Sequence, residues 1–383
     1  MCLLKCSIDN IKFNNNSNLQ IKCQLTQNNL NMAAKSVLKG KIVAFPTETV
    51  YGLGANAFDG SAVKSIFKAK GRPNDNPLIV HISNFNMFEK FFNQPLPLTY
   101  QKLIKEFWPG PLTILVRSPS SLPKETTASL STVGLRMPSN VIARALIEIS
   151  GVPLAAPSAN SSGKPSPTKA QHVLNDTYQR SEAKEVIDYI IDGGNSFVGL
   201  ESTVIDGISV PGKIKVLRPG GITLEHLKNS IGEDNVIYEK PTKVSEDFKP
   251  LTPGLKYKHY SPKAKVLIFL PNTSNNQTTD PIQFISNLPK EQHIGCMTLT
   301  DSNLTNNLFN QNNFNNHNLI PYILGPNSNP SEIARNVFDG LHYLDSLNVD
   351  LIIVEGVKEE NEGLAIMNRL FKAAGDTSNI YYI

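Results

Sequence analysis

Short apolar segments alternate with segments of helical periodicity along the last third of this 383-residue chain, and this alternation limits the folds open to it. Strands are predicted at 265–270, 293–299, 319–324 and 351–354, with helices between them at 281–288, 331–347 and 363–374. Short apolar strands that alternate with helices are typical of a small parallel α/β sheet.

The first two thirds of the chain carry more strands, at less regular intervals. Apolar, β-branched segments predict strands at 41–45, 78–82, 112–116, 133–136, 154–156, 186–191, 202–206 and 215–217. Helices are predicted at 32–38, 61–70, 140–149, 169–174 and 224–230. The helix over 61–70 has Asp59 available as an N-cap and Gly71 as its stop. The strand spacing is too irregular for repeated βαβ units, so a mixed sheet is expected here.

Four parts follow from these patterns. Residues 1–30 are rich in asparagine and predict a loose lead-in with at most one strand, at 19–25. A first α/β domain is expected over 31–231, and a polar, aperiodic linker over 232–262. The second α/β domain covers 263–383, and 303–318, with nine asparagines, predicts a disordered insertion within it.

Composition excludes several classes of protein. No segment approaches the roughly 18–20 uninterrupted apolar residues of a membrane-spanning helix. A net charge of +4 is weak for a dedicated nucleic-acid binder. The four cysteines show no CxxC spacing, which argues against a zinc site or a disulfide framework. With no signal-like N-terminus, a cytoplasmic protein that does not engage membranes is expected.

The segment GLGANA at 52–57 matches a dinucleotide-binding pattern, with Asp75 roughly 20 residues on. The preceding strand is expected to end at Phe45, however, so residues 46–51 separate it from the first glycine. The tight turn that aims a helix at pyrophosphate cannot form across that gap, and a nicotinamide site is not expected.

Polar residues crowd into loops at the predicted strand and helix ends. FPTETVYG at 45–52 leaves a strand with two hydroxyls, a carboxylate and a phenol. Lys70 alone could be a helix-terminal cation that the macrodipole favours. Arg72 lies beyond that helix beside Pro73, so the two cations also fit a clamp for polyphosphate.

A second dense loop, 154–168, opens from a strand into serines, an asparagine and Lys164. It fits either an anion-binding loop or an ordinary Ser/Pro-rich surface loop. His81 at the end of a strand is compatible with a structural role or a chemical one. A hydrolase triad of Ser158 and His81 is not expected, because the sequence has no G-x-S-x-G elbow.

Taken in order, these segments resemble the threonylcarbamoyl-AMP synthase family, in its long form with a second domain. The resemblance rests on FPTETVYGLG (45–54), KGRP (70–73), NPLIVHI (76–82), WPGPLT (108–113), VGLRMP (133–138), AAPSAN (155–160), IDGG (191–194), ESTV (201–204), LRPG (217–220) and PGLKYKHYSP (253–262). It implies a twisted mixed sheet enclosing a large concave cavity (the YrdC-like fold), a smaller Rossmann-like domain, and a linker that covers the active site.

The implied activity is that of a nucleotidyltransferase. L-threonine, bicarbonate and ATP give L-threonylcarbamoyladenylate, pyrophosphate and water, the first step in threonylcarbamoyladenosine formation in tRNAs that read ANN codons. Mg²⁺ would arrive with ATP, and the product would pass to a threonylcarbamoyl transferase complex. Weak binding of tRNA is compatible with this activity.

The resemblance also assigns residues to each substrate. It places threonine against Thr49, His81, Arg136, Ala156 (through its backbone) and Ser202, with Thr47 close by. It places ATP against Lys70, Arg72, Asn76, Thr132, Ser158, Asn160, Ser166, Arg218 and His259. Arg136 is expected to bind the threonine carboxylate through two parallel hydrogen bonds.

Two other functions are kept as alternatives. A module that binds double-stranded RNA or tRNA without adenylation is one, although the net charge is low for it. A carbamoyltransferase that uses carbamoyl phosphate is the other. Relatives of that kind carry zinc fingers, for which four scattered cysteines are too few.

Overall fold

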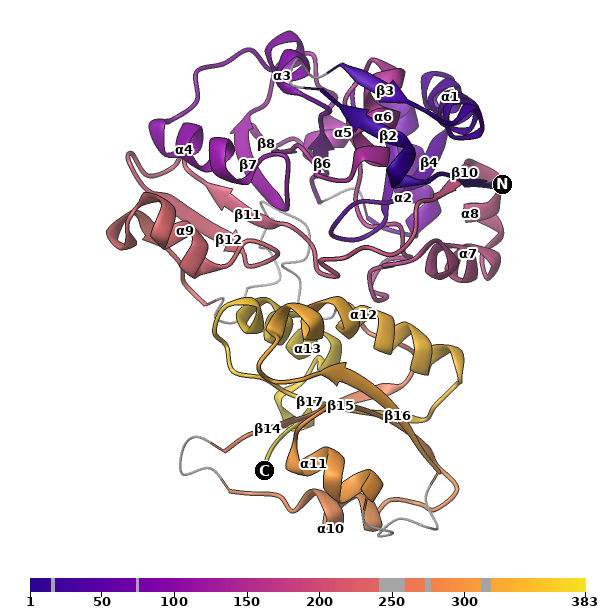
Figure 1. Ribbon diagram of the computed structural model, residues 1–383, viewed down its shortest axis with the longest axis vertical. Helices are drawn as coiled ribbons and strands as arrows, with labels where there is room; N and C mark the ends of the chain where they lie inside the picture. Colours follow the sequence, from indigo (N-terminus) through magenta and orange to yellow (C-terminus); the bar gives the residue numbers. More distant parts are fainter. Residues whose placement is uncertain (15–17, 74–75, 241–258, 273–276, 311–317) are drawn as a thin grey trace. The chain divides into compact units, whose positions relative to one another are not determined.

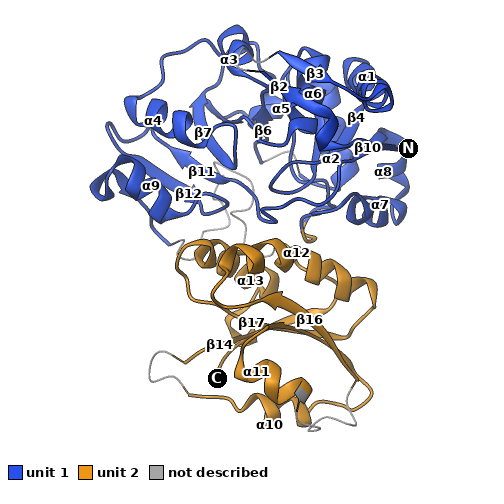
Figure 2. Ribbon diagram, viewed as in Figure 1, with its two compact units in different colours: residues 1–162, 166–256 blue, residues 163–165, 257–383 orange. Residues whose placement is uncertain are grey.

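The chain divides into two compact units (Figure 2). The computed structural model describes residues 1–14, 18–73, 76–240, 259–272, 277–310 and 318–383. Unit 1 comprises Met1–Ser162 and Ser166–Lys256, and unit 2 comprises Gly163–Pro165 and Tyr257–Ile383. Most of the predicted linker, 241–258, lies outside the described residues.

Unit 1 is built on one mixed sheet (Figure 1). In spatial order its strands are β1 (Cys2–Lys5), β10 (Ile187–Asp192), β4 (Ile42–Phe45), β5 (Gly52–Asn56), β9 (Leu154–Ala155), β6 (Ile79–His81), β8 (Thr132–Arg136), β7 (Leu112–Arg117), β11 (Thr203–Asp206), β12 (Ile214–Arg218) and β13 (Val236–Ile237). Strand β6 is parallel to β8, whereas β4 is antiparallel to β5 and β7 is antiparallel to β8. The predicted mixed α/β architecture is confirmed.

Helices pack around this sheet. They are α1 (Gln24–Leu38), α2 (Gly60–Lys70), α3 (Phe85–Phe91), α4 (Leu98–Phe107), α5 (Lys124–Thr127), α6 (Val141–Ser150), α7 (Ala170–Tyr178), α8 (Ser181–Val186) and α9 (Leu224–Ile231). Helix α2 begins where the Asp59 carboxylate accepts hydrogen bonds from the backbone N–H groups of Ser61 and Ala62. It ends at Gly71, whose φ of 57° lies in the left-handed region. Both predicted ends of this helix are therefore confirmed.

The first 30 residues are not a loose lead-in. Strand β1 pairs in parallel with β10 and extends the main sheet, and β2 (Ile11–Phe13) and β3 (Leu19–Ile21) form a separate antiparallel ribbon. Helix α1 already begins at Gln24. The sequence concealed this because each strand is only three or four residues long and buries few side chains, among them Leu4 and Ile11.

Two further expectations are corrected at the edges of the units. Strand β13 pairs with β12, so the sheet of unit 1 continues into the stretch predicted as linker. The asparagine-rich segment contains helix α11 (Asn303–Thr305) followed by a π-helical turn, Asn306–Asn310. Leu304 and Leu308, four residues apart, are both buried in the core of unit 2 and give this segment its order. Residues 311–317 lie outside the described part of the chain.

Unit 2 contains the predicted parallel sheet. Its strands, in spatial order, are β16 (Asn318–Gly325), β15 (His293–Leu299), β17 (Leu351–Glu355), β14 (Lys265–Leu270) and β18 (Ile380–Tyr382), and every pair is parallel. Helices α12 (Pro330–Ser346) and α13 (Glu362–Ala374) cover one face, and α10 (Pro281–Ser286) and α11 the other (Figure 1). Within the ranges given above, no helix has the length and apolar character needed to cross a membrane.

The N-terminal strand provides a test of the revised domain boundary. Leu4 is 5% exposed on the core side of β1, and its neighbour Leu3 is 37% exposed. Leu4→Ala should lower the free energy of unfolding of unit 1 by roughly 2–3 kcal/mol, because it leaves a cavity in the core. Leu3→Ala is the matched control and should change it by less than about 0.5 kcal/mol. Urea unfolding of both variants measures this, and equal effects would mean that β1 does not belong to the cooperative unit.

Candidate functional site

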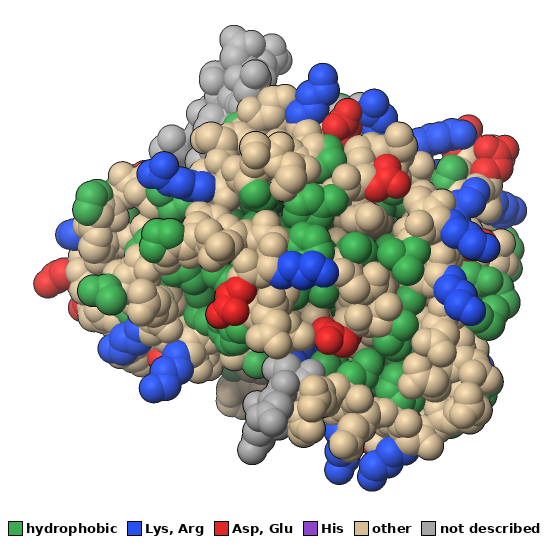
Figure 3. All heavy atoms as spheres, turned by 90° about the horizontal axis from the view of Figure 1, so that it is seen from above, with side chains coloured by type: hydrophobic (Ala, Val, Ile, Leu, Met, Phe, Trp, Pro, Cys, Tyr) green, Lys and Arg blue, Asp and Glu red, His purple; other side chains and the backbone are tan. Residues whose placement is uncertain are grey.

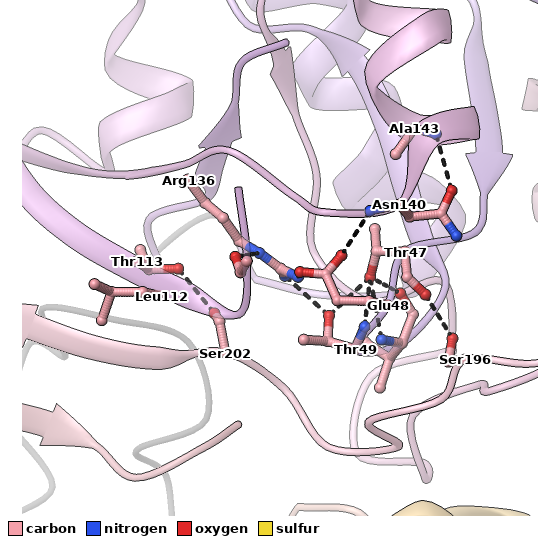
Figure 4. A network of polar contacts seen from close by, with 12 residues as sticks. Thr47, Glu48, Thr49, Leu112, Thr113, Arg136, Asn140, Ala143, Ser196 and Ser202 are labelled. Carbon is pink, nitrogen blue, oxygen red and sulfur yellow. Dashed lines mark hydrogen bonds and ion pairs between the residues drawn. The ribbon is translucent and has the colours of Figure 1, made fainter. Parts of the chain in front are cut away.

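The turn between β4 and β5 carries buried polar side chains (Figure 4). The Thr47 hydroxyl accepts hydrogen bonds from the backbone N–H groups of Thr49 and Val50, and it donates to the Val50 carbonyl. Its oxygen lies 2.7 Å from the Thr49 hydroxyl. These local bonds fix the turn, so that Glu48 and Thr49 are presented to the strands beside it.

Arg136, the last residue of β8, extends its guanidinium into this turn (Figure 4). Its Nη2 donates to Glu48 Oε1 at 2.5 Å, and its Nη1 donates to the Thr49 hydroxyl at 2.9 Å. Its Nε donates to the Gly110 carbonyl at 3.3 Å. Arg136 is 4% exposed and Glu48 is 0% exposed, so this is a buried ion pair in which each charge compensates the other.

Two hydroxyls lie near Arg136, one on the neighbouring strand β7 and one just before β11 (Figure 4). Thr113 of β7 is the cross-strand partner of Arg136, and its hydroxyl oxygen lies 2.8 Å from that of Ser202. Ser202 in turn accepts hydrogen bonds from Arg218, at its hydroxyl (3.1 Å) and at its carbonyl (2.8 Å).

The chain segments around Ser202 approach each other closely. A Cβ atom on Gly220 would lie 2.3 Å from the backbone oxygen of Glu201. Only glycine therefore fits this position of the LRPG motif, and its close packing holds Arg218 beside Ser202.

His81 borders the same group of residues. It ends β6 directly opposite Arg136 of β8, and its ring meets the Phe45 ring edge-on, with 6.3 Å between centroids. Burial, together with the positive charge of Arg136, lowers the pKa of His81 to about 3. Its Nδ1 is buried and has no hydrogen-bond partner among the described residues. A neutral imidazole with an unsatisfied nitrogen is therefore available to a bound molecule.

A second group of polar contacts surrounds the end of α2. The Lys70 ammonium donates to the Ser158 carbonyl at 2.6 Å and also to the Asn160 carbonyl. Burial lowers the pKa of Lys70 well below its usual range, and the positive charge of Arg72 acts in the same direction. Lys70 thus fixes the backbone of the Ser158–Asn160 loop, while half-buried Arg72 lies 5.9 Å from the centre of the Phe67 ring.

The remaining residues predicted to bind ATP lie on other segments of the chain. The Ser166 hydroxyl donates to Glu201 at 2.6 Å, and Asn76 is buried. Thr132 lies at the opposite end of β8 from Arg136 and pairs with Arg117 of β7. His259 belongs to unit 2, where its ring packs against the Tyr260 ring, with 4.1 Å between the ring centroids.

Comparisons with known proteins identify the relatives of this chain. A family model described as "Telomere recombination" matches residues 35–220, and one described as "Threonylcarbamoyl-AMP synthase, C-terminal domain" matches 222–375. Curated proteins named threonylcarbamoyl-AMP synthase are similar over most of this chain. The Pyrococcus abyssi protein is 41% identical over 93% of this chain and 97% of its own length. The Schizosaccharomyces pombe protein is 44% identical over 87% of this chain and 84% of its own.

This chain belongs to the threonylcarbamoyl-AMP synthase family. A solved structure, P. abyssi Sua5 complexed with L-threonine, has a TM-score of 0.78 and 37% identity, and it covers 100% of this chain and 99% of its own. The family resemblance read from the sequence motifs is therefore confirmed.

The residues that the family motifs assign to threonine lie at the ends of the central strands of unit 1 or in the loops next to them. Arg136 contacts Thr49 directly, lies opposite His81, and reaches Ser202 through Thr113. Ala156 donates its backbone N–H to the Ile79 carbonyl, beside His81. Of the residues assigned to ATP, Lys70, Ser158 and Asn160 form one group, and Arg218 joins the Ser202 group.

Sequence reasoning missed the acidic and hydroxyl partners of these residues. Glu48, Thr113 and Glu201 each lie inside a motif of the threonylcarbamoyl-AMP synthase family, yet none was assigned a role. The carboxylates of Glu48 and Glu201 could have been recognised as candidates, because a charge in a segment expected to be buried requires a partner. Over the residues described, no group of three or more His, Cys, Asp or Glu side chains could hold a metal ion.

The pKa of His81 gives a pH-dependent prediction. Its value in the native state, about 3, lies below the ordinary 6.5, so between these limits the unfolded chain binds a proton that the native state does not. The native protein should therefore lose stability as the pH falls below 6.5. Relative to a His81→Gln variant, the wild type should lose about 2 kcal/mol between pH 8 and pH 5. Urea unfolding at both pH values measures this, and equal losses in the two proteins would contradict it.

Proposed function

We propose that this chain catalyses the reaction of its family, in which L-threonine, bicarbonate and ATP give threonylcarbamoyl-AMP, pyrophosphate and water. The buried polar cluster around Arg136 carries the proposal. It combines a cation, several hydroxyls and a neutral imidazole, which are groups suited to an amino-acid carboxylate, ammonium and hydroxyl.

Threonine is assigned to this cluster for two reasons. The Arg136 guanidinium has five N–H donors, of which three have the partners Glu48, Thr49 and Gly110. The contact with Glu48 holds its plane in one orientation and leaves donors for a carboxylate. Among relatives, P. abyssi Sua5 has been solved complexed with L-threonine, and this chain covers 99% of that structure.

ATP is assigned to the group around Lys70. Here two cations, Lys70 and Arg72, and the loop from Ser158 to Asn160 lie at the end of α2. In the reaction, a carbamate oxygen of carboxylated threonine attacks the α-phosphorus, and the bond between that phosphorus and the bridging oxygen to the β-phosphate breaks. Pyrophosphate leaves with that oxygen. Cations near this group would stabilise the developing charge.

Mg²⁺ is proposed to enter with ATP. Phosphate oxygens and water supply most of its ligands in such complexes, so a dedicated cage of carboxylates is not required. Because substrate attacks substrate, no side chain has to act as a nucleophile, and catalysis relies on positioning. The product would then serve a separate transferase that modifies tRNA.

The alternative of an RNA-binding module without adenylation is not favoured by the relatives, which are named as synthases. On the face that Figure 3 draws, basic and acidic side chains are interspersed. A continuous basic stripe, which an RNA-binding surface would need, is not visible on that face.

Pyrophosphate release tests the proposed reaction. The purified chain with ATP and Mg²⁺ should release pyrophosphate only when both threonine and bicarbonate are present. Serine or glycine should replace threonine poorly, because they lack its methyl group or its hydroxyl. Release that is independent of either substrate would contradict the proposal, as would no release from a folded protein.

Arg136 provides the sharper test of the threonine assignment. Arg136→Lys keeps the charge but loses the planar pair of donors, so the KM for threonine should rise at least about tenfold. The KM for ATP should change little. Arg117→Lys, the same substitution at an exposed position of β7, is the matched control and should leave both constants unchanged. Equal increases in both KM values for Arg136→Lys would place threonine elsewhere.

A further inference from the structure

Asp176 and Arg180 connect the two segments assigned to ATP, although neither lies in the sequence motifs named above. Asp176 lies in the last turn of α7, and Arg180 follows two residues after that helix ends. Their side chains form an ion pair, with Arg180 Nη2 at 2.8 Å from Asp176 Oδ2. Asp176 is 15% and Arg180 25% exposed, so the pair is largely shielded from water.

Asp176 holds the loop that follows β9. One carboxylate oxygen accepts the backbone N–H of Ser161 at 2.7 Å, and the other accepts the Ser161 hydroxyl at 2.6 Å. Ser161 comes directly after Asn160, which is assigned to ATP. Two charge-assisted hydrogen bonds to one residue restrict both its backbone and its side chain.

Arg180 holds the other segment. Its Nη1 donates to the carbonyl of Ala69, in the last turn of α2. The next residue is Lys70, and Arg72 follows two residues later. A cation at this end of a helix is also favoured by the helix dipole.

Lys70 connects the end of α2 to the same loop directly. Its ammonium donates to the carbonyls of Ser158 and Asn160, and its own carbonyl accepts the N–H of Ser162 at 2.8 Å. The path from Lys70 to the loop, to Asp176, to Arg180 and back to the end of α2 is therefore a closed ring of contacts.

The ring also affects the charge on Lys70. Burial lowers the pKa of that ammonium, and the negative charge of Asp176 acts in the opposite direction. Removing Asp176 would thus loosen the loop and disfavour the charged form of the lysine at the same time.

We propose that Asp176 and Arg180 are positioning residues for ATP, which hold the Lys70–Arg72 segment and the Ser158–Asn160 loop at a fixed separation. This inference rests on the proposed function, in which those two segments bind the nucleotide. Asp176 acts through Ser161, and Arg180 acts through the carbonyl of Ala69, next to Lys70. The effect on ATP comes from the two segments that this ion pair connects.

Asp176→Asn is the decisive variant. An amide offers one acceptor where the carboxylate offers two, so one of the bonds from Ser161 is lost and Arg180 loses its counter-charge. The KM for ATP should rise about tenfold, because the loss of one charge-assisted hydrogen bond leaves the Ser158–Asn160 loop less firmly held. The KM for threonine and the melting temperature should stay close to wild type.

Three further variants separate positioning from a general structural role. Asp176→Glu keeps the charge and should recover most of the affinity for ATP. Glu185→Gln removes the carboxylate that pairs with Lys68 on the exposed side of α2, and it should leave the KM for ATP unchanged. Ser161→Ala combined with Asp176→Asn should be no worse than Asp176→Asn alone, because both act on the same contact.

Direct binding distinguishes failure of this inference from failure of the proposed function. The affinity for AMPCPP, an ATP analogue that cannot release pyrophosphate, is measured by calorimetry on the full chain. Weaker binding by Asp176→Asn but not by Glu185→Gln supports the inference whether or not turnover is seen. Equal affinity of Asp176→Asn and wild type overturns it. A wild type that binds AMPCPP but releases no pyrophosphate with threonine and bicarbonate contradicts only the proposed function.

Discussion

Glu48 and Arg136 form an ion pair in the interior of unit 1, and the arrangement of the central strands depends on it. Removing either partner would leave an isolated charge away from water, which destabilises a fold far more than losing a surface pair. The pair joins the turn after β4 to the end of β8, and Glu48 also accepts the backbone N–H of Asn140, just before α6. Three segments that are distant in sequence are thereby fixed relative to one another, and Thr49, Thr113 and His81 are brought around a single guanidinium.

The group around Lys70 is organised by a similar principle with different partners. The burial of Lys70 is compensated by hydrogen bonds to backbone carbonyls instead of a carboxylate, and the negative charges of Asp176 and Glu201 favour its charged form. In both groups a cation that is assigned to substrate already has hydrogen-bond partners within the protein. Such groups need little reorganisation when a ligand binds, which is what a reaction between two bound anions requires.

Much of the fold was predictable from the sequence, because apolar periodicity reports on regular, well-buried elements. Strands β14 and β15 have the bounds predicted for them, and α2 begins and ends at the expected capping residues. Strands β1 and β2 and the order within 303–310 were missed, because these short elements bury few side chains. Strand β3 lies within the one strand expected in this part of the chain, 19–25. The role of Lys70 as a donor to backbone carbonyls was also beyond reach, since a pattern of residue types does not reveal which backbone atoms a loop turns inward. The pairing of Asp176 with Arg180 and the serine and carbonyl that this pair holds were likewise not predicted, because neither residue lies in a segment whose pattern indicates a site.

The comparison between the two units shows where sequence patterns carry functional information. In unit 2 the strands are mostly apolar and regular, local preference agrees with the fold, and the pattern alone predicts all strands of the sheet except β18. In unit 1 the pattern is interrupted where Thr47, Glu48, Thr49, His81 and Arg136 are buried at the ends of strands, against the usual preference of such residues for the surface. A fold accepts these interruptions only where partners offset the loss of hydration, and the partners that do so also orient the side chains. The interruptions in the apolar pattern therefore mark the site, and the sequence showed their positions before the structure showed how they meet.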